Sequence, residues 1–227
     1  MMFVKKNEML KNLFSFFSAA RIHSSKRKDR ADLFVTWEAI YDVKVQNIEA
    51  LIHTDGRKGC ALSHQLVANT LEPPYIVLED DAIPTTACFT DVEALRDLQN
   101  IKDFDILYLG GMPAFGHRPS AFPSIRKGKA WTTHALIVFP QGAKWFQDFS
   151  FEGTPIDVAL ARSNLRQGFL KQEWFVQASS ISDVNQSAFT KSVFFTENLN
   201  VFRSVWRLVV LHQYLALLFF FLFIFLR

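Results

Sequence analysis

Apolar and polar positions along this chain predict short strands separated by helices. The uninterrupted apolar run 75–78 predicts a strand buried on both faces, because nothing in it alternates. In residues 59–70 the apolar positions recur at helical spacing, with Leu62 and Leu66 four residues apart. The full predicted order is helix 59–70, strand 75–78, helix 85–98 capped by Thr85 or Thr86, strand 105–109, loop 112–130, strand 133–139, helix 141–149, helix 154–165 and strand 173–177.

This alternation predicts one α/β domain with a mostly parallel, Rossmann-like sheet. The chain has 227 residues, enough for such a domain with a proper core. Ligands of these sheets bind beyond the carboxyl ends of the strands. At the amino-terminal end, 14–20 is the only candidate for a first strand, and no convincing strand is predicted directly before Ser24.

Three carboxylates, Glu79, Asp80 and Asp81, follow directly on the strand predicted at 75–78. Adjacent carboxylates repel one another, and a structural role such as capping the next helix needs only one of them. Hard divalent cations bind clustered carboxylate oxygens, and the bound cation can in turn hold a diphosphate. The cluster therefore favours a metal site over a merely acidic strand end.

Composition narrows the function classes. The net charge is only +3, which gives no argument for nucleic acid as a partner. A basic run at 21–30 is either a solvated loop or a surface that faces phosphate or anionic lipid. The two cysteines, Cys60 and Cys88, make no disulfide framework, and we interpret both as reduced core residues.

Residues 208–226 carry no charge and lie between Arg207 and Arg227. A helix of this length matches the hydrocarbon thickness of a bilayer, so the stretch predicts a single transmembrane helix. A buried core helix is the alternative, but this sequence would need burial on every side. The stretch therefore predicts a membrane protein, and its domain faces the cytoplasm if the tail is inserted after translation.

A series of motifs runs through the middle of the chain: GCALSH at 59–64, LEDD at 78–81, FDILYLG at 104–110, THALIV with GAK at 133–144, PID at 155–157 and VQ with SSI at 176–181. In kind and in order these motifs resemble glycosyltransferase family 25, which includes bacterial lipooligosaccharide transferases and collagen galactosyltransferases. The resemblance covers roughly residues 56–185. It divides the chain into a divergent or truncated N-terminal part (1–55), a family 25-like core (56–190), a juxtamembrane linker (191–207) and the transmembrane helix (208–226).

The resemblance implies the GT-A fold and a metal-dependent hexosyltransferase. The donor would be a UDP-sugar carrying galactose or glucose, and the cofactor Mn²⁺ or Mg²⁺. The acceptor would be a hydroxyl of a glycan, a glycolipid or a protein, as in lipopolysaccharide biosynthesis. The family's short nucleotide-holding segment corresponds to the region near 24–30.

Residue roles follow from matching these motifs position by position. Glu79 and Asp81 would bind the metal, and Asp157 and Asp81 would be catalytic, with Asp157 as the base that takes the acceptor proton. Contacts to the donor would come from Ser63, His64, Asp80, Asp105 and His134.

Several of these residues have a structural alternative. The segment with Ser63 and His64 can simply pack a helix, and His134 can be a satisfied core histidine. Asp105 can cap a loop at Lys102, and Asp157 can belong to a capping-box-like helix start with Thr154.

Other function classes stay open. The first alternative is a catalytically degenerate member of the same fold that acts as a membrane-tethered binding or scaffold subunit. A metal-dependent phosphohydrolase would need a further ligand cluster, and none has convincing spacing. A purely structural protein would tolerate loss of the three carboxylates.

Overall fold

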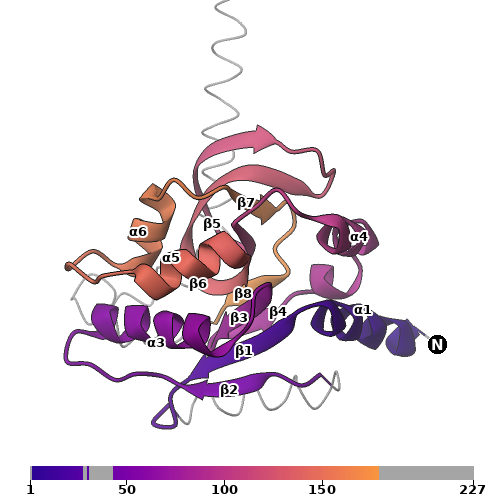
Figure 1. Cartoon of the computed structure of the whole chain (residues 1–227). Coiled ribbons are helices and arrows are strands. Elements are labelled where there is room, and N and C mark those ends of the chain that lie inside the picture. The colour runs from indigo at the N-terminus through magenta and orange to yellow at the C-terminus, as the bar shows by residue number, and fades with distance from the viewer. Residues whose placement is uncertain (1, 28–29, 31–42, 179–227) are drawn as a thin grey trace, which may run out of the picture. The chain divides into compact units, whose positions relative to one another are not determined.

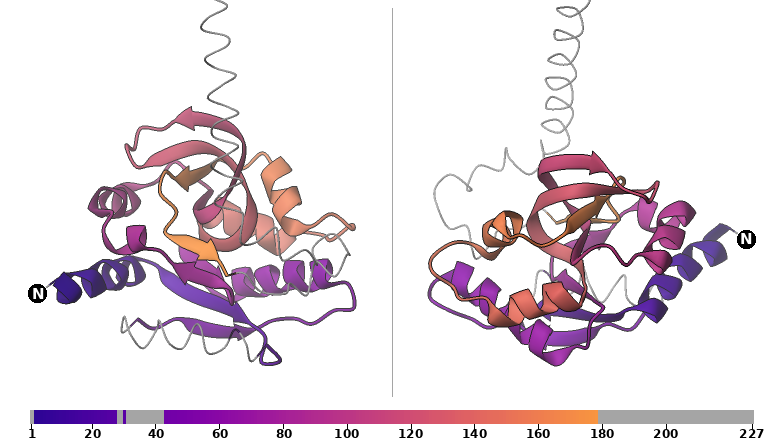
Figure 2. Two further views of the ribbon diagram at one scale, coloured as in Figure 1. Left: turned by 180° about the vertical axis from the view of Figure 1, so that it is seen from behind. Right: turned by 45° about the horizontal axis from the view of Figure 1, so that its top comes forward.

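Two layers of helices cover the two faces of a central sheet in the computed structural model (Figures 1 and 2). The structure describes residues 2–27, 30 and 43–178, which all belong to one compact unit within residues 1–180. The helices are α1 (Met2–Phe16), α3 (Gly56–Thr70), α4 (Val92–Asn100), α5 (Pro140–Asp148) and α6 (Ile156–Arg162), with the 3₁₀ turn η1 (Thr86–Phe89). The strands are β1 (Ser18–His23), β2 (Gln46–Glu49), β3 (Tyr75–Glu79), β4 (Ala82–Pro84), β5 (Ile106–Pro119), β6 (Ile125–Val138), β7 (Gln167–Leu170) and β8 (Phe175–Gln177).

The central sheet has the strand order β2-β1-β3-β6-β5-β7 and is mostly parallel. β1 runs parallel to both β2 and β3, and β5 runs parallel to β7. Only β6 is reversed, since it pairs antiparallel with β3, β5 and β7. A small separate sheet joins β4 to β8. The mixed α/β fold with a mostly parallel, Rossmann-compatible sheet is therefore confirmed.

Successive side chains of each strand point to opposite faces of the sheet, so a hydrophobic core forms on each face. Tyr75 and Val77 of β3 pack with α3, α5 and α6 on one face, while Ile76 and Leu78 pack with α1 and α4 on the other. All four side chains are fully buried, as the apolar run predicted. By the same period of two, Glu79 at the end of β3 faces the α3 side.

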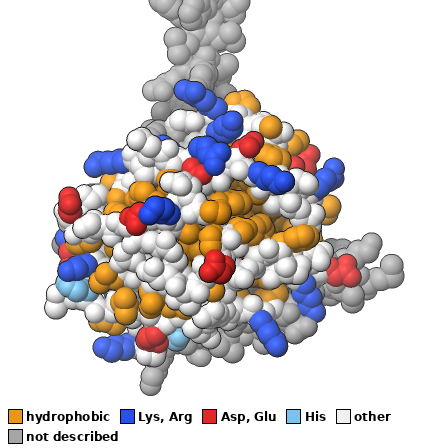
Figure 3. All heavy atoms as spheres, viewed as in Figure 1, with side chains coloured by type: hydrophobic (Ala, Val, Ile, Leu, Met, Phe, Trp, Pro, Cys, Tyr) orange, Lys and Arg blue, Asp and Glu red, His pale blue; other side chains and the backbone are white. Residues whose placement is uncertain are grey.

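The surface over this α3 side is partly apolar (Figure 3). Hydrophobic side chains gather near its centre, and Lys and Arg side chains lie mainly around them. Trp145, Phe149 and Phe151 are partly buried residues packed on the core of this face. Trp131, which belongs to β6, is among the more exposed large hydrophobic residues of the described chain.

The prediction that no strand lies directly before Ser24 was wrong, and the candidate strand 14–20 overlaps the observed strand only in part. β1 is a full strand, and it ends at His23, directly before Ser24. It was missed because Arg21 interrupts its apolar pattern, although Arg21 is only 4% exposed and bonds to Asn47. The helix α1 precedes β1, and its Leu10 and Leu13 are fully buried in the core.

The helix predicted at 85–98 is confirmed only in part, because the chain forms the 3₁₀ turn η1 and then α4 instead of one continuous helix. The Thr85 hydroxyl donates to the Glu173 carbonyl at 2.6 Å instead of capping a helix. Asp91 is the cap that starts α4, because its carboxylate accepts from the Ala94 N–H at 3.0 Å. The chain therefore forms β4, η1 and a shorter helix in this region.

The predicted loop 112–130 is a long hairpin. β5 continues past Gly110 and Gly111 to Pro119, and β6 begins at Ile125. Register shifts along the pair absorb the glycines and prolines that suggested a loop. The strand β7 was missed because it has only four residues and, since all four are buried, it shows no alternation between a buried and an exposed face.

The remaining predicted elements are confirmed with small changes of boundary: α3, β3, the carboxyl half of β6, α5, α6 and β8. Within the part of the chain that the structure describes, no helix is long and apolar enough to span a membrane. The predicted linker 191–207 and transmembrane helix 208–226 lie outside the described residues.

Candidate functional site

The acidic turn 79–81 lies at the carboxyl end of β3, near the centre of the sheet. The first of its three residues, Glu79, faces α3 and β6. Its Oε1 accepts a hydrogen bond from the Thr133 hydroxyl at 2.6 Å and lies 3.1 Å from His64 Nε2. Side chains from three separate elements thus converge on one carboxylate oxygen.

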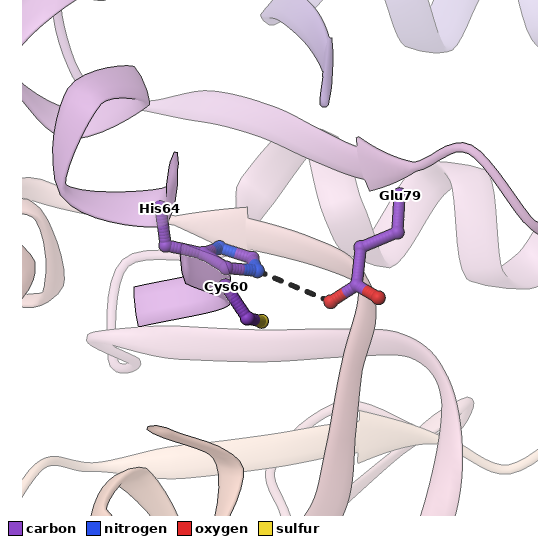
Figure 4. Close-up of side chains that lie close together, drawn as sticks. All are labelled: Cys60, His64 and Glu79. Carbon is purple, nitrogen blue, oxygen red and sulfur yellow. Dashed lines mark hydrogen bonds and ion pairs between the residues drawn. The ribbon is translucent and has the colours of Figure 1, made fainter. Parts of the chain in front are cut away.

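Cys60 and His64 reach this point from the same face of α3. They are four residues apart, so their side chains lie one turn apart on the helix. The helix begins at Gly56 because Asp55 caps its amino-terminal end, accepting a hydrogen bond from the Arg57 N–H at 3.0 Å. The sulfur of Cys60, a ring nitrogen of His64 and a carboxylate oxygen of Glu79 all lie within 4.8 Å of one another (Figure 4).

The surroundings hold His64 firmly in place. Its ring stacks on Phe146 of α5, with centroids 5.5 Å apart and planes 16° apart. His64 is 2% exposed, whereas the Glu79 side chain is 21% exposed. The cluster is therefore anchored on the helix side and reached by solvent on the strand side.

The surroundings shift the pKa values of the Glu79 carboxylate and the Cys60 thiol in opposite directions. Burial acts to raise the pKa of Glu79, but the hydrogen bond and charge of His64 and the hydrogen bond of Thr133 lower it to about 2. Burial, with the charges of Glu79 and Asp157, raises the pKa of the Cys60 thiol. Glu79 is therefore an anion at neutral pH, and Cys60 without a bound cation is a neutral thiol.

Asp80 and Asp81 face a different partner, Arg30. Its guanidinium pairs with Asp80 and lies 3.2 Å from Asp81 Oδ2. The Gln177 amide of β8 also donates to Asp81 Oδ2, at 3.0 Å. Asp81 Oδ1 is buried and, among the described residues, has no hydrogen-bond partner.

Burial and the nearby charge of Glu79 raise the pKa of Asp81 to about 7, against the opposing charge of Arg30. Asp81 is 3% exposed. A buried carboxylate with a raised pKa and an unused oxygen is the arrangement in which a bound cation gains most.

Ser63 lies outside this cluster. Its hydroxyl donates to the Gly59 carbonyl at 2.8 Å and accepts from the Leu51 N–H at 2.8 Å. A Cβ on Gly59 would lie 2.7 Å from the Leu51 carbonyl oxygen, so this glycine permits the close approach. Ser63 and Gly59 fasten the segment after β2 to α3, and a contact from Ser63 to a donor is not supported.

His134 is buried and lies close enough to Glu79 for its charge to act on that carboxylate. Its Nδ1 lies 3.1 Å from the Thr132 hydroxyl, and its Nε2 lies 3.4 Å from the Phe175 carbonyl. Thr132 has a φ of 81°, a strained conformation for a β-branched residue. Such strain is typical of functional sites, and here it occurs at the residue whose hydroxyl contacts the His134 ring.

Asp157 lies in the first turn of α6, where its Oδ1 accepts from the Val158 N–H at 2.8 Å. The helix cap is Pro155, without a side-chain bond, so the predicted capping role of Thr154 was wrong. The charge of Asp157 acts on both Cys60 and Tyr108, which places its carboxylate on the same side of the sheet as the cluster.

Asp105 is at the opposite end of the sheet. It precedes Ile106, which pairs with Val138, the partner of Tyr75 at the amino end of β3. Its carboxylate bonds to Arg166, with Nη2 to Oδ1 at 2.7 Å and the backbone N–H to Oδ2 at 2.8 Å. The structure therefore gives Asp105 a structural role and does not bring it to the acidic turn.

The sequence interpretation missed four residues of the site. Cys60 was available from its spacing to His64 on the predicted helix, and Arg30 from the basic run 21–30. Thr133 and Gln177 stand in the motifs at 133–138 and 176–177, but nothing in the sequence marked their contacts with the acidic turn, because each is brought in by pairing between distant strands.

Neither a family model nor a curated protein matches this sequence.

Proposed function

We propose that the protein is a metal-dependent glycosyltransferase with a GT-A fold, similar to family 25, which moves galactose or glucose from a UDP-sugar to an acceptor hydroxyl. The observation that carries this proposal is the acidic turn at the carboxyl end of the central strand β3, where the buried Asp81 Oδ1 has no partner in the part of the chain that the structure describes. In a mostly parallel sheet this is the edge at which ligands bind.

The residues present fit a hard divalent cation. Asp81 offers a carboxylate oxygen without a hydrogen-bond partner among the described residues, and burial and the charge of Glu79 raise its pKa even beside Arg30. Asp81, with Asp80 or the outer oxygen of Glu79, would hold Mn²⁺ or Mg²⁺. When bound, that ion would supply charge neutralisation for the UDP leaving group.

The protein's own groups would do the rest. Arg30 follows β1 in the region that corresponds to the family's nucleotide-holding segment, and it already orients both aspartates. A guanidinium in this position is suited to bind a phosphate oxygen. Asp157, half-buried on the α3 side, would accept the proton of the acceptor hydroxyl. Membrane attachment through residues 208–226, with the domain facing the cytoplasm, would place this chemistry beside a lipid-linked acceptor.

The test is UDP release by the full-length protein in detergent, measured over a panel of UDP-sugars with Mn²⁺, with Mg²⁺ and with a chelator. We expect release from one sugar, dependent on the added metal. Folded protein that releases UDP from no sugar under any of these conditions would contradict the proposal.

A second candidate is a binding subunit of the same fold without turnover. It is favoured by Arg30, which pairs with both Asp80 and Asp81 and already supplies part of the positive charge that a cation would bring. Saturable UDP binding that needs no metal, together with no release, would identify this case.

A further inference from the structure

A second group of ligand atoms meets the acidic turn at Glu79, and the proposed transfer leaves the Cys60 sulfur, the His64 ring nitrogen and the inner Glu79 oxygen unused. It contains three different donor types, the thiol of Cys60, the imidazole of His64 and the carboxylate of Glu79. The His64 Nε2 to Glu79 Oε1 distance is 3.1 Å, and all three donor atoms lie within 4.8 Å. Ligands of one tetrahedral zinc ion at about 2.0–2.3 Å from the metal are about 3.3–3.8 Å apart. Small side-chain movements therefore bring the three atoms onto one ion.

The ligand types of Cys60, His64 and Glu79 determine which metal they would prefer. Thiolate and imidazole ligands favour zinc and related transition metals, whereas Mg²⁺ and Mn²⁺ prefer oxygen ligands alone. The spacing of Cys60 and His64, four residues apart on one helix face, presents two ligands to one point. The third ligand comes from a strand end that the sheet holds independently of the helix.

The hydrogen bonds around the cluster match those around a metal ligand. Thr133 donates to Glu79 Oε1 and orients that carboxylate, while Phe146 fixes the plane of the His64 ring. A hydrogen-bonded His64–Glu79 pair would explain these two residues, and packing against the core would explain Cys60, but neither accounts for three different ligand types meeting at one point. Zinc replaces that direct hydrogen bond with two bonds to the ion. The proton that His64 Nε2 shares with Glu79 and the Cys60 thiol proton both pass to solvent, and the neutral imidazole keeps its proton on Nδ1.

We propose that Cys60 Sγ, His64 Nε2 and Glu79 Oε1 bind one Zn²⁺, which ties α3 to the carboxyl end of β3. The described residues supply three ligands, and the exposed side of Glu79 leaves the fourth position to water. This site goes beyond the proposed transferase activity and does not depend on it. The transfer proposal is tested by UDP release, and the zinc proposal by metal binding without any sugar donor.

The experiment uses the full-length protein, stripped with a chelator and titrated with Co²⁺ as a spectroscopic substitute for zinc. We expect a thiolate-to-cobalt charge-transfer band together with the visible bands of a four-coordinate ion, saturating at one equivalent. Added Zn²⁺ should remove both. Folded wild-type protein that shows no charge-transfer band would overturn the proposal, whatever its transferase activity.

Matched variants separate this site from other metal binding. Cys60→Ser should abolish the charge-transfer band, whereas Cys88→Ser, which changes the other free cysteine, should leave it intact. His64→Asn should weaken zinc binding by more than about 100-fold, and Thr133→Val by about 10–100-fold. A band that persists in Cys60→Ser, or disappears in Cys88→Ser, would also overturn the proposal. Circular dichroism of each variant checks that it is folded.

Discussion

The two ends of the central sheet each hold a buried aspartate with an arginine, but the two pairs differ in what they leave unsatisfied. At the amino end of β5, both oxygens of Asp105 are bonded by Arg166. At the carboxyl end of β3, Asp81 shares Arg30 with Asp80 and keeps one buried oxygen without a partner among the described residues. Burial and charge raise the pKa of Asp81, whereas Arg166 lowers that of Asp105 despite its burial. The complete pair is explained by the fold alone, whereas the incomplete one is where our proposal puts a ligand.

The strongest test of this difference between the two ends of the sheet is the substitution Asp81→Asn. The amide keeps the shape of the side chain but removes the charge that a cation needs, so UDP release should fall about 1,000-fold, or ~4 kcal/mol in barrier. Stability should change by less than about 1 kcal/mol, because the lost Arg30 contact is offset by relief of repulsion from Glu79. Initial-rate assays and urea denaturation measure the two effects.

The matched control is Asp148→Asn. This carboxylate is exposed on α5 and pairs only with Lys144 among the contacts described for it. Its activity should equal that of the wild type. Equal activity of Asp81→Asn and wild type would remove the acidic turn from the proposed mechanism.

A second pair of variants compares the packing at the two ends. A Cβ on Gly110 would lie 1.9 Å from the Phe175 carbonyl oxygen, and one on Gly142 would lie 2.3 Å from the Asp105 carbonyl oxygen. Each alanine should destabilise the fold by about 3 kcal/mol, because backbone must move. Only Gly110→Ala displaces β8, which carries Gln177. We therefore expect only this variant to bind UDP more weakly, measured at a temperature where both variants are folded. Equal loss of binding in both variants would contradict the separation of the two ends.

Asp105→Asn should lower the free energy of unfolding by about 1–2 kcal/mol at neutral pH, since it loses a charged hydrogen-bond pair whose arginine is largely exposed. UDP release should be unchanged. The folded pKa of Asp105 lies below the ordinary 3.8, so its stabilisation is present above that value and disappears as the pH falls below it. Urea denaturation at about pH 7 and about pH 3 should therefore show a smaller acid loss in the variant than in the wild type. An equal acid loss would assign the acid sensitivity to other groups.

The smallest expected effect is that of Ser63→Ala, about 1 kcal/mol of stability, because the hydrogen bonds of its hydroxyl to the Leu51 N–H and the Gly59 carbonyl are lost. Affinity for the UDP-sugar should stay within about twofold, which corresponds to well under 1 kcal/mol. A clear rise in KM with unchanged stability would restore the donor contact that the family resemblance implies for this residue. Thr70→Ala, at the exposed end of the same helix, serves as the control for helix effects.

Part of the site was predictable because its signals are local. The acidic turn follows an apolar run, and His64 lies on a helix whose pattern is visible in the sequence. The role of Ser63 was not predictable, since its partner Leu51 lies in a segment without regular pattern. Asp105 was misjudged for a related reason, because only the pairing of β5 shows at which end of the sheet it lies.

What the sequence by itself determined is therefore the set of locally encoded elements, including α3, β3 and α5, together with the three carboxylates at the end of one buried strand. Tertiary structure alone decided which of those carboxylates meets which partner. Arg30, Thr133 and Gln177 reach the turn through strands far apart in the chain. Hydrophobic periodicity reports only which face of an element is buried, whereas the register between distant strands depends on how the whole sheet packs.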